Sequence, residues 1–313
     1  MTFTDALIKQ IDRKRSHVVV GLDPSYDNLP THLKRSEESL SDIAVAIKMF
    51  TREIIDAVHE VVPAVKPQIA FFERYGIDGL KAFADTVEYA KQKGLIVIED
   101  AKRNDVGSTA IAYSDGHIGR VKVGKGTIPI FDVDAITVNP YFGKDGIDPF
   151  LDDVVKYGKG IFILVKTSNQ SSKDLQDVEV LQKGKILKLY EIVASLVDKW
   201  GSDIIGDYKY SSVGAVVGAT FPKEAQRLRE LMPRAYFLVP GYGVQGGKAA
   251  DIVNFFNKDG YGALIAASRS IIYAFKQGRK YKDNEFAVAA REAVIQMNND
   301  INDKLRTVGL LRW

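Results

Sequence analysis

Cysteine is absent from this 313-residue sequence. Its absence excludes disulfides, thiolate metal sites and a cysteine nucleophile, and it agrees with a reducing compartment. Long apolar runs are also missing, because no segment approaches the roughly 20 apolar residues that a membrane-spanning helix needs. Residues 1–15 predict a charged amphipathic helix and lack the apolar core of a signal peptide. We therefore expect a cytoplasmic protein with no membrane partner.

An excess of one charge is missing as well. Lys and Arg number 43 against 40 for Asp and Glu, which gives a net charge of +3. This balance is not typical of proteins that bind polyanions, so we expect no nucleic-acid partner. Histidine is scarce, and its four positions (17, 32, 59 and 117) do not have the spacing of metal ligands. We expect these histidines at the surface or in packing contacts.

Short apolar runs are what the sequence does contain, each followed by turn-forming residues and then by helical periodicity. Eight such runs cover residues 17–23, 64–70, 94–100, 134–140, 160–167, 213–220, 235–240 and 262–268. Continuous apolar strands that alternate with helices predict a parallel sheet covered by helices. The expected helices include 42–60, 76–92, 182–200 and 223–231.

Eight strand–helix units close most economically into a (β/α)8 barrel. A doubly wound open sheet is the alternative, but no G-x-G-x-x-G motif follows the first strand. Two connections, 119–132 after the third helix and 168–180 after the fifth strand, exceed the usual loop length and are candidate lids. Without a linker or repeat, residues 1–313 are expected to form a single domain.

In such a barrel the carboxyl ends of the strands converge on the active site. Polar or turn-forming residues occupy these ends: Asp23, Lys66, Asp100, Lys102, Asn139, Thr167, Ser168, Pro240, Gly241, Ser268 and Arg269. The ends therefore provide the candidate site residues.

A charged segment, IEDAKRNDVG at 98–107, follows the third strand. Asp100 and Lys102 point the same way along an extended chain, and with Lys66 and Asp105 they can form an alternating array of charges. A charged lysine in such an array can stabilise a carbanion and donate a proton to it. A structural network of ion pairs, or an exposed loop, explains the same residues.

The glycine-rich segment 239–247 and the segment 266–270 follow the last two strands, where barrels often bind phosphate. Gly241, Gly243, Gly246 and Gly247 suit a close approach of the backbone to a ligand, while Gln245 and Arg269 supply side-chain donors. We therefore favour a phosphorylated ligand. The alternative is that the glycines serve only the geometry of a turn.

Two further motifs are weaker. In GLDPS (21–25), Asp23 can accept hydrogen bonds from sugar hydroxyls or can cap the next helix. In KTSNQSS (166–172), Ser168 and Asn169 can recognise a planar polar ring or can simply form a turn.

Together, the motifs resemble those of the orotidine 5′-monophosphate decarboxylase family over nearly the whole chain. They are GLDP (21–24), VKPQ (65–68), DAKRNDVGST (100–109), TVNPYFG (137–143), KTSN (166–169), PGYGVQGG (240–247) and SRSI (268–271). Sister barrels that act on sugar phosphates share the D-x-K-x-x-D signature, so the ordered set is more specific than that signature alone. The two long connections resemble those of the larger-subunit branch found in many bacteria.

The resemblance implies the conversion of orotidine 5′-monophosphate to uridine 5′-monophosphate without a metal or an organic cofactor. It implies that Lys102 protonates the ring carbon that loses carbon dioxide and that Asp100 faces the departing carboxylate. Lys66 and Asp105 would complete the array. The implied substrate-binding residues are Asp23, Lys66 and Asp105 for the ribose, Ser168 for the pyrimidine, and Gln245, Arg269 and the backbone around Gly241 and Gly243 for the phosphate. Thr109, Pro240 and Ser268 are also implied to bind the substrate.

The resemblance also implies a homodimer, in which Asp105 and Thr109 reach the partner's site. Two departures concern loops: Gln170 stands where relatives usually have proline, and Asn104 where glycine is common. The alternative functions are a metal-dependent sugar-phosphate decarboxylase or aldolase on a sister barrel, and a nucleotide-binding protein without catalytic activity.

Overall fold

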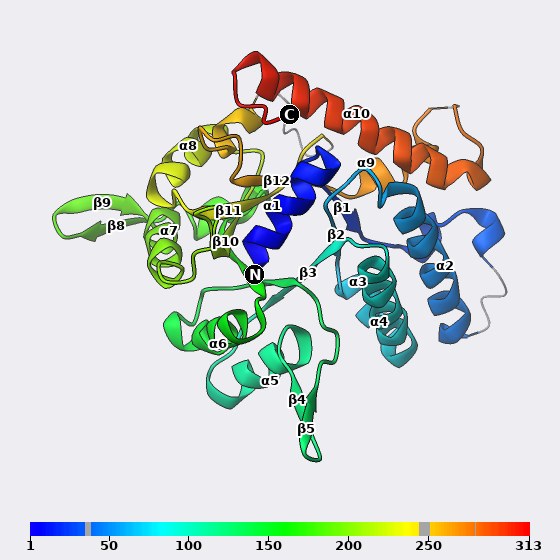
Figure 1. Ribbon diagram of the computed structural model, residues 1–313, viewed down its shortest axis with the longest axis horizontal. Helices are drawn as coiled ribbons and strands as arrows, with labels where there is room; N and C mark the ends of the chain where they lie inside the picture. Colours follow the sequence, from blue (N-terminus) through cyan, green and yellow to red (C-terminus); the bar gives the residue numbers. More distant parts are fainter. Residues whose placement is uncertain (35–38, 244–250, 279) are drawn as a thin grey trace.

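The computed structural model describes residues 1–34, 39–243, 251–278 and 280–313. Eight parallel strands form a closed barrel in the order β1-β12-β11-β10-β7-β6-β3-β2 (Figure 1). They are β1 (Val18–Leu22), β2 (Ala64–Pro67), β3 (Ile96–Arg103), β6 (Ala135–Val138), β7 (Gly160–Lys166), β10 (Ser211–Val217), β11 (Ala235–Pro240) and β12 (Ala263–Ala267). Each strand lies within or overlaps one of the eight apolar runs, and the predicted (β/α)8 barrel is confirmed.

Helices pack around the barrel, and most of the longer ones are amphipathic and bury an apolar face. They are α1 (Phe3–Lys14), α2 (Leu40–Val58), α3 (Ala70–Glu73), α4 (Gly76–Gln92), α5 (Gly107–His117), α6 (Asp148–Tyr157), α7 (Leu189–Trp200), α8 (Pro222–Leu231), α9 (Arg269–Ile272) and α10 (Phe286–Thr307). Short 3₁₀ helices are η1 (Tyr26–Asn28), η2 (Thr31–Leu33), η3 (Lys144–Gly146), η4 (Gln170–Asp174), η5 (Ile252–Phe255), η6 (Ala274–Lys276) and η7 (Asp283–Glu285). None of the helices in the described ranges is long and apolar enough to span a membrane.

Helix α1 covers the amino-terminal end of the barrel (Figure 1). Its apolar side chains, including Leu7 and Ile8, belong to the same buried cluster as the barrel-interior residue Phe162. The ring of Phe3 meets that of Phe162 edge to face, with centroids 5.9 Å apart. One end of the barrel is thereby filled with side chains, and the carboxyl ends of the strands remain as the open end.

The connection 119–132 contains an antiparallel hairpin of β4 (Val121–Val123) and β5 (Gly126–Ile128). The connection after β7 extends beyond residue 180 because it ends in a second hairpin, β8 (Glu179–Gln182) with β9 (Lys185–Lys188). The prediction of helix from residue 182 is wrong for 182–188, since α7 begins at Leu189. The reason is the turn between β8 and β9. Lys183 and Gly184 both adopt positive φ, 49° and 76°, as a tight hairpin turn requires.

Candidate active site at the carboxyl ends of the strands

The open end of the barrel holds a pocket of about 190 Å³. Its lining includes seven of the predicted site residues: Asp23, Lys66, Asp100, Pro240, Gly241, Ser268 and Arg269. Tyr242, which the sequence did not single out, also lines it. Residues from both ends of the chain thus meet in one place because the barrel closes β1 against β12.

Asp100 is held between two lysines at the edge of this pocket. The Lys66 ammonium donates to Oδ2 of Asp100 at 2.7 Å, and the Lys102 ammonium contacts Oδ1 of the same carboxylate. Lys66 is buried, whereas the Lys102 side chain is 45% exposed. The inner lysine therefore fixes the carboxylate, and the outer one stays accessible to a ligand.

The charges of this cluster keep one another ionised. Burial by itself would raise the pKa of Asp100, but the charges of Lys66 and Lys102 outweigh it and hold that pKa well below its ordinary value. Burial would likewise lower the pKa of Lys66, but the charges of Asp100 and Asp23 raise it above its ordinary value. Both pKa shifts favour the charged form of the group, so the buried pair is ionic at neutral pH.

Thr137 on β6 supports the cluster and was missed by the sequence analysis. Its hydroxyl accepts from the backbone N–H groups of Ala101 and Lys102, each at 3.0 Å, and lies 3.2 Å from Asp100 Oδ1, to which it donates. Lys102 needs this support because its φ is +52°, a strained conformation for a residue with a side chain. The available signal was a polar residue within the apolar run 134–140.

Replacing Thr137 with Val keeps the shape of the side chain but removes the acceptor for two backbone donors. We expect kcat/KM to fall by about tenfold, since an unmade buried hydrogen bond costs about 1–3 kcal/mol. Steady-state kinetics on the substrate proposed below measure this loss. Thr127→Val, on the exposed strand β5, serves as the control and should leave kcat/KM unchanged. Equal kinetics for the two variants would contradict a supporting role for Thr137.

Asp105 does not join the array within a single chain. It lies beyond β3, where its carboxylate accepts from the adjacent backbone N–H of Val106 at 2.7 Å. Between the described residues of this chain, Asp105 makes no ion pair with Lys66 or Lys102. Thr109 lies exposed on α5. The structure therefore brings together three of the four predicted members of the array.

The predicted phosphate side of the pocket is partly described. Gly241 and Gly243 follow β11 with positive φ of 98° and 75°, and Arg269 follows β12 as an exposed residue. Gln245 lies outside the described residues, as do Gly246 and Gly247. Backbone and guanidinium donors of two neighbouring strands thus face one pocket, which suits an oxyanion.

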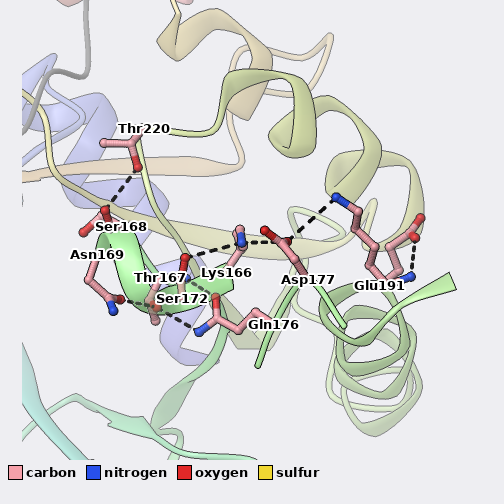
Figure 2. A network of polar contacts seen from close by, with 10 residues as sticks. Lys166, Thr167, Ser168, Asn169, Ser172, Gln176, Asp177, Glu191 and Thr220 are labelled. Atoms are coloured by element: carbon pink, nitrogen blue, oxygen red, sulfur yellow. Dashed lines mark hydrogen bonds and ion pairs between the residues drawn. The ribbon is translucent and has the colours of Figure 1, made fainter. Parts of the chain in front are cut away.

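Asp23 and Ser168 occupy opposite sides of the barrel mouth. A carboxylate oxygen of Asp23, Oδ1, is buried and has no hydrogen-bond partner among the described residues, so it is free for a ligand. The alternative of a helix cap is wrong, because Ser25 occupies the N-cap of η1. Ser168 follows β7, and its backbone carbonyl accepts from the Thr220 hydroxyl at 3.4 Å (Figure 2).

Comparison with known proteins agrees with this geometry. Residues 16–283 match the model of the orotidine 5′-phosphate decarboxylase / HUMPS family. The chain is 43% identical to an orotidine 5′-phosphate decarboxylase of Caldicellulosiruptor bescii, over 96% of this chain and 98% of that protein. It is 42% identical to one of Rhodopirellula baltica, over 96% and 99% of the two chains.

A solved structure provides an independent comparison. The Leishmania donovani OMP decarboxylase superposes with a TM-score of 0.72 at 31% identity, over 97% of this chain and 98% of that one. Sequence, barrel and pocket therefore agree, and the chain belongs to the orotidine 5′-phosphate decarboxylase family.

Proposed function

We infer that this protein converts orotidine 5′-phosphate to uridine 5′-phosphate and carbon dioxide in pyrimidine biosynthesis. The observation that carries this function is the Asp100 carboxylate held between Lys66 and Lys102 at the mouth of a barrel of this family. The alternative, a metal-dependent sugar-phosphate lyase, has no support among the relatives described above. The enzyme is thus a carbon–carbon lyase acting on a nucleotide.

Lys102 is the proposed proton donor. When the bond between the ring carbon and the carboxylate breaks, its electron pair stays on the ring carbon and carbon dioxide leaves. No adjacent π-system can absorb this charge, so a nearby ammonium is the natural source of stabilisation. The proton then passes from Lys102 to that carbon, and solvent restores the ammonium through its exposed side.

Asp100 is proposed to face the departing carboxylate. Its low pKa keeps it charged when a second carboxylate enters the pocket, and repulsion between them is relieved as carbon dioxide forms. Lys66 is the buried partner that holds Asp100 in this position despite the repulsion. The proposed mechanism thus depends on the Asp100 carboxylate staying ionised, so that protonation does not relieve its repulsion of the substrate carboxylate.

The rest of the pocket binds parts of the substrate remote from the reacting carbon. Asp23 and Lys66 are proposed for the ribose hydroxyls and Ser168 for the pyrimidine edge. The proposed phosphate ligands are Arg269, Gln245, Ser268 and the backbone from Pro240 to Gly243. Such remote contacts can align the reacting groups and so raise kcat as well as affinity.

A homodimer is proposed to complete the site, with Asp105 and Thr109 reaching the partner's pocket. In support, both residues lie at an exposed part of the surface where Val106 and Ile111 are 44% and 50% exposed. Apolar side chains on such a surface favour association with another chain.

A cytoplasmic location is also proposed, and the lack of cysteine supports it.

Direct turnover tests the function. We expect the purified protein to abolish the orotate-type ultraviolet absorbance of orotidine 5′-phosphate and to yield uridine 5′-phosphate, with a chelator present throughout. Activity should survive the chelator because the proposed mechanism assigns proton donation and charge stabilisation to Lys102 alone. A properly folded protein that leaves the absorbance unchanged would refute the function, and strict dependence on added metal would favour the sister activity.

Arg269→Ala tests the phosphate contact. We expect kcat/KM to fall, with a rise of about 2–5 kcal/mol in the activation free energy, because the bound dianion loses a charged partner. The control is Arg306→Ala, since Arg306 pairs with Asp303 on the exposed face of α10, away from the pocket. A loss below about 1 kcal/mol would mean that the phosphate binds elsewhere.

A further inference from the structure

Lys166, the last residue of β7, is a fully buried cation outside the pocket described above. Its ammonium donates to Asp177 Oδ1 at 2.8 Å and to the Ser172 hydroxyl at 3.4 Å (Figure 2). It also lies 4.5 Å from the ring centroid of Phe221. The side chain itself has 0% exposure. A cation this deeply buried is costly unless it is paired, so its position needs an explanation.

An irregularity in the barrel directs Lys166 toward these partners. The pairing of β10 with β7 passes from Val216↔Leu164 to Val217↔Lys166, so β7 carries one extra residue at its end. Bulges of this kind redirect side chains at the rims of barrels. Lys166 accordingly contacts the connection that follows β7.

The segment 167–177, which we name the base loop, leaves β7 and returns beside its own start. Gln176 joins the two ends, because its Oε1 accepts from the Thr167 backbone N–H at 3.0 Å and its Nε2 donates to the Thr167 hydroxyl at 2.8 Å. The backbone N–H of Gln176 also donates to Ser172 O at 2.8 Å. Lys166 therefore sits at the closure of a compact loop, next to both of its ends.

Ser168 is clamped within this arrangement. The Lys166 carbonyl accepts from Gly218 N at 2.7 Å, and a Cβ added at Gly218 would lie 2.7 Å from Ser168 Cα. The Thr220 hydroxyl donates to the Ser168 carbonyl on the same side. Since the backbone of Ser168 is in close contact with the end of β10, a change in the base loop must move Ser168 or strain these contacts.

We propose that Lys166 is a positioning residue for recognition of the pyrimidine. Its ammonium, through Asp177 and Ser172, holds the base loop closed so that Ser168 meets the edge of the substrate's ring. The inference rests on the proposed role of Ser168. It assigns to Lys166 an effect on the base alone, because the phosphate and ribose residues belong to other strands.

Binding of two ligands tests this assignment. Uridine 5′-phosphate contains the base, whereas ribose 5-phosphate presents the same phosphate and a sugar without it. For Lys166→Met we expect calorimetry to show about 10- to 100-fold weaker binding of uridine 5′-phosphate, the scale of a small misplacement of a contacting group. Binding of ribose 5-phosphate should stay within about twofold of wild type, at the level of a distant surface substitution. Equal losses for both ligands would overturn the proposal.

Lys188→Met is the matched control. Lys188 lies 4.0 Å from the same Asp177 oxygen, but its side chain is 40% exposed, so its ion pair is weak. We expect both ligands to bind this variant as they bind the wild type. A base-specific loss as large as that of Lys166→Met would overturn a special role for the buried cation.

Ser168→Ala separates the inference from the function on which it rests. If this variant binds uridine 5′-phosphate normally, the proposed role of Ser168 is wrong. If Ser168→Ala weakens that binding and Lys166→Met does not, Lys166 has no positioning role. We expect the double variant to bind uridine 5′-phosphate no more weakly than the weaker-binding of the two single variants, because both changes disrupt the same contact with the base. Additive losses would contradict this dependence.

Asp177→Asn keeps the test decisive if Lys166→Met fails to fold. The substitution conserves volume in the base loop while removing the charge that holds Lys166. The same base-specific loss is expected. Unchanged binding of both ligands, or an equal loss of both, would overturn the proposal.

Discussion

Two inactive variants, Lys102→Ala and Asp105→Asn, are expected to regain activity when they are unfolded together and refolded as mixed dimers. Asp105 makes no ion pair with the lysines of its own chain, and the proposed dimer places it in the partner's site. A mixed dimer then has one site with both lesions and one site with none. Random pairing makes half of the dimers mixed, so about a quarter of all sites should recover full activity.

The control for this experiment combines Lys102→Ala with Lys66→Met. Both lysines contact the same carboxylate of their own chain, so every site in a mixed dimer keeps one lesion. We expect no recovery there. If Lys102→Ala with Asp105→Asn also stays at the average of the separate variants, despite demonstrated exchange of subunits, then Asp105 acts within its own chain or not at all.

Asp100→Asn is expected to impair both catalysis and stability. Loss of the facing charge should lower kcat by about 10³-fold, the scale of removing one preorganised electrostatic group. The same change leaves the buried Lys66 ammonium without its partner, and breaking a buried ion pair costs about 3–5 kcal/mol. Denaturant unfolding followed by tryptophan fluorescence measures the second effect. Asp78→Asn, which removes an exposed pair with Lys81, should change stability by no more than about 1 kcal/mol.

The stability difference between wild type and Asp100→Asn should depend on pH. The pKa of Asp100 is lowered in the folded state, so its contribution is present above its ordinary value of 3.8 and is lost as the pH falls through the lower folded value. The pKa of Lys66 is raised, so its contribution is present below 10.5 and is lost above the folded value. The difference should therefore be constant from about pH 5 to 10 and should narrow in acid. A difference that widens on acidification would contradict the ionic pair.

The strands were predictable because a buried parallel strand is apolar on both faces. The run 160–167 differs from β7 by one residue, for example. Residues 182–188 show where the pattern fails. Apolar residues in a hairpin can occur at intervals that also suit a helix. The turn depends on positive φ at Lys183 and Gly184, and a lysine gives no sequence signal for that conformation.

The site was predictable where chemistry coincides with a strand end, as at Lys66 and Asp100. Thr137 was not, because its contacts depend on an irregularity in the pairing of β3 with β6 between Glu99 and Arg103. Lys166 lies in a motif that the sequence singled out, but its burial follows from a bulge and from side chains distant in sequence. In the proposed dimer, the position of Asp105 relative to the array depends on a second chain, which the motif alone cannot place.

Helix α1, which fills the amino-terminal end of the barrel, limits the routes by which substrate can enter and products can leave. Phe3 and Leu7 occupy the space through which a passage along the barrel axis would run. Substrate, carbon dioxide and uridine 5′-phosphate must then pass through the opening at the opposite end, where the segments proposed to bind the phosphate and the base also lie. Release of one nucleotide and binding of the next therefore cannot occur at the same time, and each catalytic cycle must include an interval in which this opening is empty.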